Sequence, residues 1–377
     1  ATFDLTNGVV YGALANTGSL SVPYAEITAA PRGWYRCAVG GRFVGSPANP
    51  RMFLRSANTT GDLTHTGDGS GAGYYAWGAQ LKYGLKTGGY IKSASATPKY
   101  LASAAVQTNY ATQSYDFESY WGKSNCYMQK NLLLYSEQLH DATNWNTASG
   151  LVTVTADVAI NPLNGSLNAD SIVPNTTSGN HRIYQMFTAI SGTKYTYSVY
   201  VKANGYSKIG IREANTTGVY IAYDISTQTL LDSTGATNQT ITSVGSGWYR
   251  ISFTQTTASS GTFAFSINVL SPTYTSGDFV LAGNLWSGDG TSGIYAWGAQ
   301  LVLGTSPENY RATTSGALPI LSTAPDGTGN ATKFLENTTA SAYHIMGTQF
   351  PVPFIEDNYY AYSVYVKAAE RSKVYLK

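Results

Sequence analysis

Apolar and polar residues alternate along several short segments of the chain. In residues 248–254, Tyr249, Ile251 and Phe253 occupy one set of positions, and Trp248 and Arg250 fall in the other. Successive side chains of a β-strand point to opposite faces, so alternation with period two indicates a strand with one buried face. The pattern therefore predicts that Tyr249, Ile251 and Phe253 face a core, whereas Trp248 and Arg250 face outward.

Three further segments, residues 34–39, 195–202 and 295–301, follow the same alternation. Outward positions are predicted for Trp34, Arg36, Tyr200 and Lys202, and inward positions are predicted for Trp297 and its earlier copy Trp77. On this assignment, Trp248→Ala should leave the fold largely intact. Trp297→Ala should cost about 3–5 kcal/mol, as a large-to-small change in a core does.

The predicted strands are short, and Gly-Asp-Gly, Ser-Gly-Thr and Asn-Gly turns separate them. Charged residues make up 12% of the chain and aromatic residues 13%, including 30 tyrosines, whereas an ordinary soluble domain is roughly 25% charged. Aromatic and β-branched side chains pack well on pleated surfaces, and Gly and Asn suit tight turns. The sequence thus predicts an all-β fold built from antiparallel β-sandwiches.

Internal repeats define the structural unit. Gly-Trp-Tyr-Arg occurs at 33–36 and 247–250, and Tyr-Ala-Trp-Gly-Ala-Gln-Leu occurs at 75–81 and 295–301, which is 220 positions later (297 − 77). A second repeat, Tyr-Ser-Val-Tyr-Val-Lys-Ala, occurs at 197–203 and 362–368. Only the middle of the chain contains both kinds of repeat, so we expect one complete module there.

The repeats predict four regions. Residues 1–96 form the C-terminal part of a first module, 97–130 a connector, 131–313 a complete module and 314–377 the N-terminal part of a third module. One explanation is that the chain is a piece of a longer array. The alternative is that the C-terminal half-module of one subunit pairs with the N-terminal half-module of the next, in a head-to-tail fibre.

The motifs of the middle region resemble a known family. Asn-Leu-Leu-Leu-Tyr-Ser-Glu-Gln at 131–138 is followed by Trp145, the repeats at 197–203 and 247–250, and Gly-Asp-Gly-Thr-Ser-Gly at 288–293 leading to Trp297. This set resembles the carbohydrate-binding-like jelly-roll modules that are repeated in bacteriophage tail-fibre, head-fibre and minor structural proteins. The resemblance implies tandem jelly rolls, a virion or cell-surface setting and glycan contact. It transfers no catalytic residue.

The outward residues form three pairs of an aromatic ring and a cation: Trp248 with Arg250, Tyr200 with Lys202, and Trp34 with Arg36. Aromatic rings can lie against the apolar faces of sugars while polar side chains bind the hydroxyls, so these pairs are the candidate glycan-binding residues. The alternative is cross-strand packing, in which each cation stacks on a ring to cover the sheet. Trp77 and Trp297 are expected to be structural.

Nucleic-acid and membrane partners are not expected. The formal net charge is +2 without a basic block, and binding to phosphate backbones depends on clustered Lys and Arg. No apolar run approaches the roughly 18 residues that span a bilayer. Cys37 and Cys126 make neither a disulfide framework nor a metal site, and Cys37 is expected to be a buried thiol.

The sequence also lacks motifs for metal binding and for catalysis. His181 and His344 have no neighbouring ligand at zinc spacing, so both are expected to be ordinary strand residues. Asp-Gly turns at Asp68, Asp289 and Asp326 are expected to be plain turns, and structural calcium is the one cofactor they leave open. Glu213 and Asp224 are the only carboxylate pair in view. No nucleophile or phosphate-loop motif occurs, so an enzyme is not expected.

Three functions remain. The first is a phage or extracellular fibre protein on the virion surface, whose modules act in adhesion to a host cell-surface glycan and which contacts other virion or fibre subunits, as a homo-oligomer or head-to-tail assembly. The second is a purely structural capsid or filament decoration protein. The third is the accessory carbohydrate-binding arm of a polysaccharide-degrading enzyme.

Overall fold

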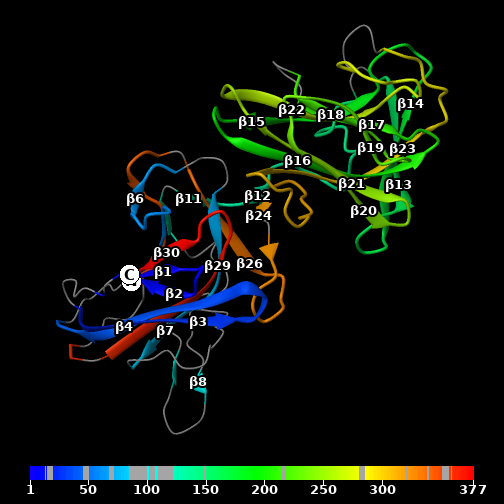
Figure 1. Cartoon of the computed structure of the whole chain (residues 1–377). Helices are drawn as coiled ribbons and strands as arrows, with labels where there is room; N and C mark the ends of the chain where they lie inside the picture. Colours follow the sequence, from blue (N-terminus) through cyan, green and yellow to red (C-terminus); the bar gives the residue numbers. More distant parts are fainter. Residues whose placement is uncertain are drawn as a thin grey trace. The chain divides into compact units, whose positions relative to one another are not determined.

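The computed structural model describes residues 1–377 except 13, 15–19, 46–50, 68–71, 85–99, 102–106, 109–121, 125, 148–149, 214–217, 280–284, 320, 338, 350–355 and 358 (Figure 1). Within the described ranges the regular structure is β-strand, apart from one 3₁₀ turn, η1 (Pro31–Gly33). Every sheet is antiparallel, which confirms the predicted all-β sandwich architecture. The chain divides into an inserted unit, residues 130–320, and a split unit, residues 1–129 with 321–377.

The inserted unit contains two facing sheets. The first sheet has the order β13 (Val152–Ile160), β14 (Leu167–Pro174), β23 (Gly293–Leu303), β16 (Lys194–Asn204), β21 (Trp248–Thr256) and β20 (Thr237–Gly245). The second has the order β15 (Arg182–Ala189), β22 (Gly261–Val269), β17 (Lys208–Glu213), β18 (Tyr220–Asp224) and β19 (Thr229–Thr234). A short pair, β12 (Lys130–Asn131) with β24 (Leu318–Pro319), brings the two ends of the unit together. The predicted module 131–313 therefore corresponds closely to one compact unit.

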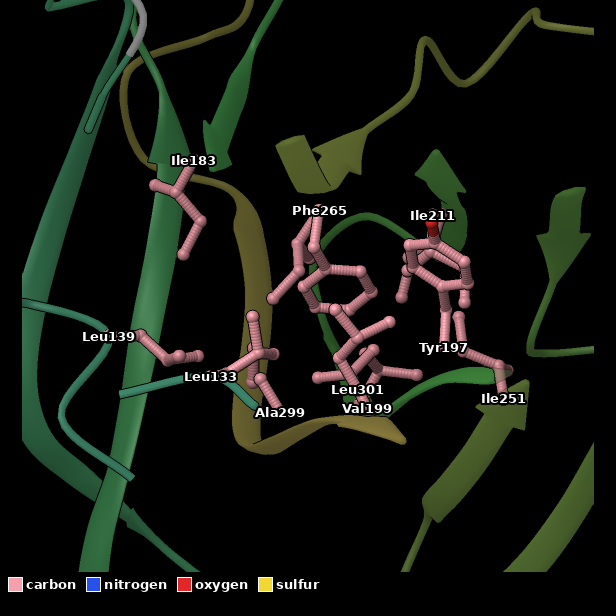
Figure 2. Packing of buried hydrophobic residues seen from close by; sticks show 14 of the residues in the cluster. Leu133, Leu139, Ile183, Tyr197, Val199, Ile211, Ile251, Phe265, Ala299 and Leu301 are labelled. Atoms are coloured by element: carbon pink, nitrogen blue, oxygen red, sulfur yellow. The ribbon is translucent and has the colours of Figure 1, made fainter. Parts of the chain in front are cut away.

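The core of the inserted unit lies between these sheets (Figure 2). Val199 of β16 and Ile251 of β21 face Ile211 and Phe265 of the second sheet, and all four are fully buried. Leu133, from the segment that precedes β13, packs into the same cluster. The inward positions predicted for Ile251 and Phe253 are confirmed, because alternation holds along β21.

The split unit also has two sheets. The first has the order β10 (Gly122–Ser124), β28 (Ile345–Gln349), β5 (Arg51–Ala57), β30 (Lys373–Leu376), β1 (Thr2–Asp4) and β2 (Val9–Tyr11). The second has the order β11 (Cys126–Met128), β26 (Ala331–Glu336), β7 (Gly73–Tyr83), β29 (Tyr359–Ala368), β4 (Trp34–Phe43) and β3 (Leu20–Ala30), with β25 (Leu321–Ser322) beside β26. Two small pairs, β6 (Thr64–His65) with β27 (Ala342–Tyr343) and β8 (Tyr100–Leu101) with β9 (Gln107–Thr108), complete the described strands.

Strands from the two ends of the chain alternate in the split unit. β29 lies between β4 and β7, and β30 lies between β5 and β1, so red and blue strands neighbour one another in Figure 1. Neither 1–96 nor 314–377 is therefore a separate partial module, contrary to the sequence prediction. The head-to-tail hypothesis is also contradicted, because segments of the same chain fill the strand edges that it assigned to a neighbouring subunit.

The two units share one register. Tyr200 pairs with Arg250 and with Trp297 in the inserted unit, and Tyr365 pairs with Arg36 and with Trp77 in the split unit. The split unit is thus a circularly permuted copy, in which the strands of the front half follow those of the back half along the chain. Repeats that never overlapped in the sequence meet in one sandwich.

The predicted connector, residues 97–130, contributes to the split unit. β10 pairs with β28, and β11 pairs with β26. The end of this segment therefore extends both sheets. Its sequence has no clear alternation of apolar and polar residues that predicts these strands.

The inserted unit buries the carboxylate of Glu213 in its core. Glu213 is fully buried, and both of its carboxylate oxygens lack a hydrogen-bond partner. Burial raises the pKa of Glu213, against smaller opposing effects of Gln255 and Arg212. A raised pKa means that ionisation opposes folding, so the native state loses stability as the pH rises above 4.5, the ordinary value, and through the raised one.

We therefore expect Glu213→Gln to stabilise the inserted unit by about 1–3 kcal/mol at pH 7, because an amide of the same shape cannot ionise and so avoids the cost of a charge in the core. Below pH 4.5 the parent and the variant should have nearly equal free energies of unfolding. Urea unfolding of the full chain at both pH values measures the difference. A variant that is less stable than the parent at pH 7 would show that the carboxylate is solvated or paired.

Candidate functional site

The first sheet of the inserted unit carries two rows of side chains on the face away from the core. Lys202 of β16 pairs with Trp248 of β21 on one side and with Tyr295 of β23 on the other. The next row along the strands is Arg250, Tyr200 and Trp297. The structure thus brings together Trp248, Arg250, Tyr200 and Lys202 on one face, as the alternation predicted.

The segment that follows β23 covers the second row. Arg250 donates hydrogen bonds to the carbonyl oxygens of Glu308 at 2.6 Å and Pro307 at 3.0 Å, and its guanidinium lies 5.3 Å from the centroid of the Tyr200 ring. Tyr310 packs against Trp297 with 4.7 Å between ring centroids. Arg250 and Tyr200 therefore hold their own chain against the sheet, which supports the cross-strand packing interpretation for this pair.

Trp248 does not present its ring to solvent, contrary to the prediction. Its side chain is 2% exposed and packs with Tyr200, Trp297 and Ala169 in a small second core. The reason is that loops cover much of the outer face of this sheet, so an outward side chain is still buried. Trp248 can offer an edge to a ligand, but its ring is no open platform for a sugar.

The equivalent pair in the split unit is closed as well. Trp34 is fully buried, and its indole N–H donates to the carbonyl oxygen of Thr323 at 3.1 Å. Arg36 donates to the side chains of Gln80 at 2.8 Å and Ser363 at 3.2 Å. Neither residue is placed to receive a glycan, because the segment after β25 packs on Trp34 and because neighbouring strands engage Arg36.

Trp297 lies on the outer face, not in the main core as predicted. The pairing of β16 with β23 shifts register between Ser198 and Tyr200, and Gly298 adopts φ of 63°. This β-bulge reverses the alternation, so that Ala299 faces the core after Trp297 has faced outward. Trp77 follows the same pattern with Gly78 at φ of 64°. Both tryptophans are nevertheless buried.

A groove of about 530 Å³ lies over the first row. Trp248, Lys202 and Tyr295 line it together with the turn that joins β13 to β14 and the turn that joins β20 to β21. On its rim, Ile160 is 60% exposed and Leu163 is 51% exposed. The sequence pointed to Lys202 and Trp248 but not to Tyr295, Ile160 or Leu163. The alternation that predicted Trp297 to face inward also puts Tyr295, two residues earlier, on the inward face. The turn at 161–166 carried no signal.

A second cavity of about 620 Å³ runs along β15. Tyr184 and Met186 line it from the strand, and Asn144 and Asn146 line it from the segment before β13. None of its lining side chains is charged, so the two cavities differ in chemistry. Sequence reasoning singled out neither Tyr184 nor these two amides.

The candidate metal ligands are engaged in local structure. The ring nitrogens of His181 lie 2.9 Å from the carbonyl oxygens of Leu151 and Trp286. Nε2 of His344 lies 3.2 Å from the backbone carbonyl oxygen of His65. Asp289 accepts hydrogen bonds from the backbone of Thr291 and Ser292, which cap its own turn.

Asp326 accepts the backbone N–H of Thr328 in the same way, whereas Asp68 lies outside the described residues. Across the described parts of the chain, no group of three or more His, Cys, Asp or Glu side chains is arranged to hold a metal ion.

The carboxylates that the sequence put forward do not converge. Asp224 pairs with Lys208 at the opposite end of β17 from Glu213, and Glu213 is buried in the core. Two carboxylates must flank one bond to hydrolyse a glycoside, so this pair does not form such a site. Cys37 is a buried free thiol, as predicted, and burial raises its pKa. The Cys126 side chain lies outside the description.

Comparisons with known proteins give distant likenesses. No family matches the chain, and no curated protein matches it. Among solved structures, the enzymatically active domain of tailspike protein 4 from bacteriophage CBA120 is 16% identical, with a TM-score of 0.29, and the match covers 46% of this chain and 21% of that one.

The CBM22-1–GH10 modules of Clostridium thermocellum xylanase 10B, solved with xylohexaose, are 15% identical with a TM-score of 0.28, covering 50% of this chain and 30% of that one. The mannan-recognising carbohydrate-binding module TmCBM27 is 12% identical with a TM-score of 0.24, and the match covers 49% of this chain and 99% of that one. The chain thus spans less than a third of the first two proteins. In the described residues, no helix has the length and apolarity needed to cross a membrane.

Proposed function

We propose that this chain is a structural protein of a phage fibre or another extracellular appendage, and that its inserted unit binds a host cell-surface glycan in the groove over β21, β16 and β23. The observation that carries the proposal is the row formed by Trp248, Lys202 and Tyr295 beneath a groove of about 530 Å³. The repeated motifs, which resemble those of phage fibre modules, support the setting.

The groove has the size and chemistry of a small-ligand site. Such sites typically span about 300–1,000 Å³ and combine apolar walls with a few polar groups. Ile160 and Leu163 offer apolar walls, Tyr295 offers a partly exposed ring, and Lys202 offers hydrogen-bond donors. A sugar ring with an apolar face and a rim of hydroxyls matches this arrangement.

We further propose that the chain binds without catalysis. The separation of Glu213 from Asp224 along β17 and β18 supports this. Binding without turnover suits an appendage that must hold on to a surface. The purely structural decoration protein and the accessory arm of a polysaccharide-degrading enzyme are the competing functions.

A glycan array probed with the full chain tests the proposal. We expect Ile160→Asp and Leu163→Asp to weaken binding at least tenfold, because each puts a charge on an apolar wall. Both side chains are largely exposed, so the fold should tolerate the changes. Met186→Asp is the matched control, since Met186 is 52% exposed and lines the other cavity.

If the full chain bound no glycan, the decoration function would be favoured. If Met186→Asp abolished binding while the two groove variants did not, the glycan would occupy the cavity along β15 instead. Turnover of a bound polysaccharide would contradict the proposal of binding without catalysis.

A further inference from the structure

We infer that the ligand of this groove is an anionic saccharide whose carboxylate pairs with Lys202; the inference rests on the proposed function. The class comprises oligosaccharides that contain uronic or sialic acids.

The lining of the groove has one sign of charge. Its residues are Ala159, Ile160, Asn161, Pro162, Leu163, Gly165, Lys202, Val244, Gly245, Ser246, Trp248 and Tyr295, with neither Asp nor Glu among them. Lys202 is the one ammonium or guanidinium in that set. A carboxylate complements this charge, whereas a neutral sugar offers only hydrogen-bond acceptors to it.

Several other cations of the chain have an ionic partner within it. Arg212 pairs with Asp278 at 3.0 Å, Lys333 with Glu370 at 3.0 Å, and Arg371 with Glu336 at 2.6 Å. Over the described ranges Lys202 forms no ion pair. An ammonium in a groove that has no ionic partner within the described chain can pair with an incoming anion.

Neighbouring residues place the alkyl stem of Lys202 beside a tight turn. Its alkyl stem lies along the turn before β21, where a Cβ added to Gly247 would be 3.5 Å from Cε of the lysine. Ser246 and Gly247 both adopt positive φ, 52° and 78°, which makes this turn tight. Pairing with Trp248 and Tyr295 on the two sides holds the strand position. The ammonium therefore extends from a stem that lies against this turn.

The split unit supplies an internal comparison. Lys367 pairs with Tyr75 as Lys202 pairs with Tyr295. There, however, the chain itself lies on the face: Trp34 donates to the carbonyl oxygen of Thr323, and Arg32 donates to that of Pro325 at 2.9 Å. In this copy, carbonyl oxygens of the chain itself thus accept hydrogen bonds beside the equivalent row. In the other copy, we assign that place to the ligand.

The experiment compares acidic oligosaccharides with their neutral parents by calorimetry on the full chain. The panel contains galacturonate, glucuronate and sialylated oligosaccharides, each with the matching neutral sugar, and oligoglutamate as a non-sugar anion. We expect at least one acidic member to bind tenfold or more tightly than its parent at low salt. The preference should shrink in 0.5 M salt, where the screening length falls to about 4 Å.

Lys202→Gln should reduce the ratio of acidic to neutral affinity to about twofold or less, whatever its effect on the neutral parent, whereas the matched control Lys367→Gln should keep that ratio. Equal affinity for acidic and neutral sugars would overturn the inference and leave the proposed function standing. If the chain bound no sugar at all, both the inference and the proposed function would be contradicted. An acid preference that survives in Lys202→Gln, or equally tight binding of oligoglutamate, would also overturn the inference.

Discussion

Replacing Trp297 by alanine is expected to lower the free energy of unfolding of the inserted unit by about 3–5 kcal/mol, the usual range for such a truncation in a packed core. The side chain is 1% exposed and packs against Tyr200 and Tyr310, with ring centroids 5.5 and 4.7 Å away. Its removal leaves a cavity in the small second core that Trp297 forms with Tyr200, Trp248 and Ala169. Trp248→Ala should cost a similar amount, because Trp248 belongs to the same cluster and is 2% exposed.

This outcome would differ from the one expected from alternation alone, in which only the Trp297 substitution is costly. Hydrogen exchange of β16, β21 and β23 in the full chain measures the loss within this unit. Thr242→Ala, an exposed position on β20, is the control and should change stability by less than about 0.5 kcal/mol. A cost below 1 kcal/mol for Trp248→Ala would mean that the outer layer contributes little to the fold.

Replacing Glu336 by glutamine should destabilise the split unit by about 3 kcal/mol at pH 7, as loss of one partner in a buried ion pair does. Glu336 accepts two hydrogen bonds from Arg371, at 2.9 and 2.6 Å, and lies 3.0 Å from Nε2 of His65. His65 belongs to the N-terminal segment and the other two to the C-terminal one. The network therefore joins the two segments that share this unit.

The same carboxylate predicts acid sensitivity. Burial opposes ionisation of Glu336, but the hydrogen bonds and charge of Arg371 and the contact with His65 outweigh it, so its pKa lies below the ordinary value of 4.5. A lowered pKa contributes stability above 4.5 that disappears as the pH falls through the native value. The difference between parent and variant should thus be full at pH 7 and shrink in acid.

Urea unfolding of the full chain at pH 7 and pH 3, read by hydrogen exchange in β5 and β26, measures both effects. Asp357→Asn is the matched control, since Asp357 pairs with Arg42 at 3.7 Å but is 72% exposed. An exposed pair contributes about 0–1 kcal/mol. Equal effects of the two substitutions would show that the buried network does not hold the segments together.

Local patterns were enough to predict the strands and the repeats. Alternation placed Ile251 and Phe253 in the core because the strand is regular there. The same rule failed at Trp297, since a bulge at Gly298 inserts one extra residue, so that Trp297 before it faces the opposite side from Ala299 and Leu301 after it. A bulge depends on the partner strand, so periodicity within one strand does not reveal it.

The candidate site was predicted in part for a related reason. The sequence placed Trp248 and Lys202 on one outward face, and the pairing of β16 with β21 confirms it. It did not show that the face is covered near Arg250 and open near Lys202, because the covering segment at 304–313 and the rim residue Ile160 come from elsewhere in the chain. Burial of an outward residue depends on those distant segments.

The sequence by itself determined the all-β class, the antiparallel sandwich and the identity of the repeated unit, because strand periodicity and turn residues are local properties. Tertiary structure alone decided that the first and last segments share one sandwich: β29 needs partners on both edges, and it finds them in β4 and β7. An unpaired backbone edge can be satisfied by any strand of matching register. Only the folded structure shows which strand pairs with that edge. The groove that Lys202 lines likewise forms only when distant segments come together.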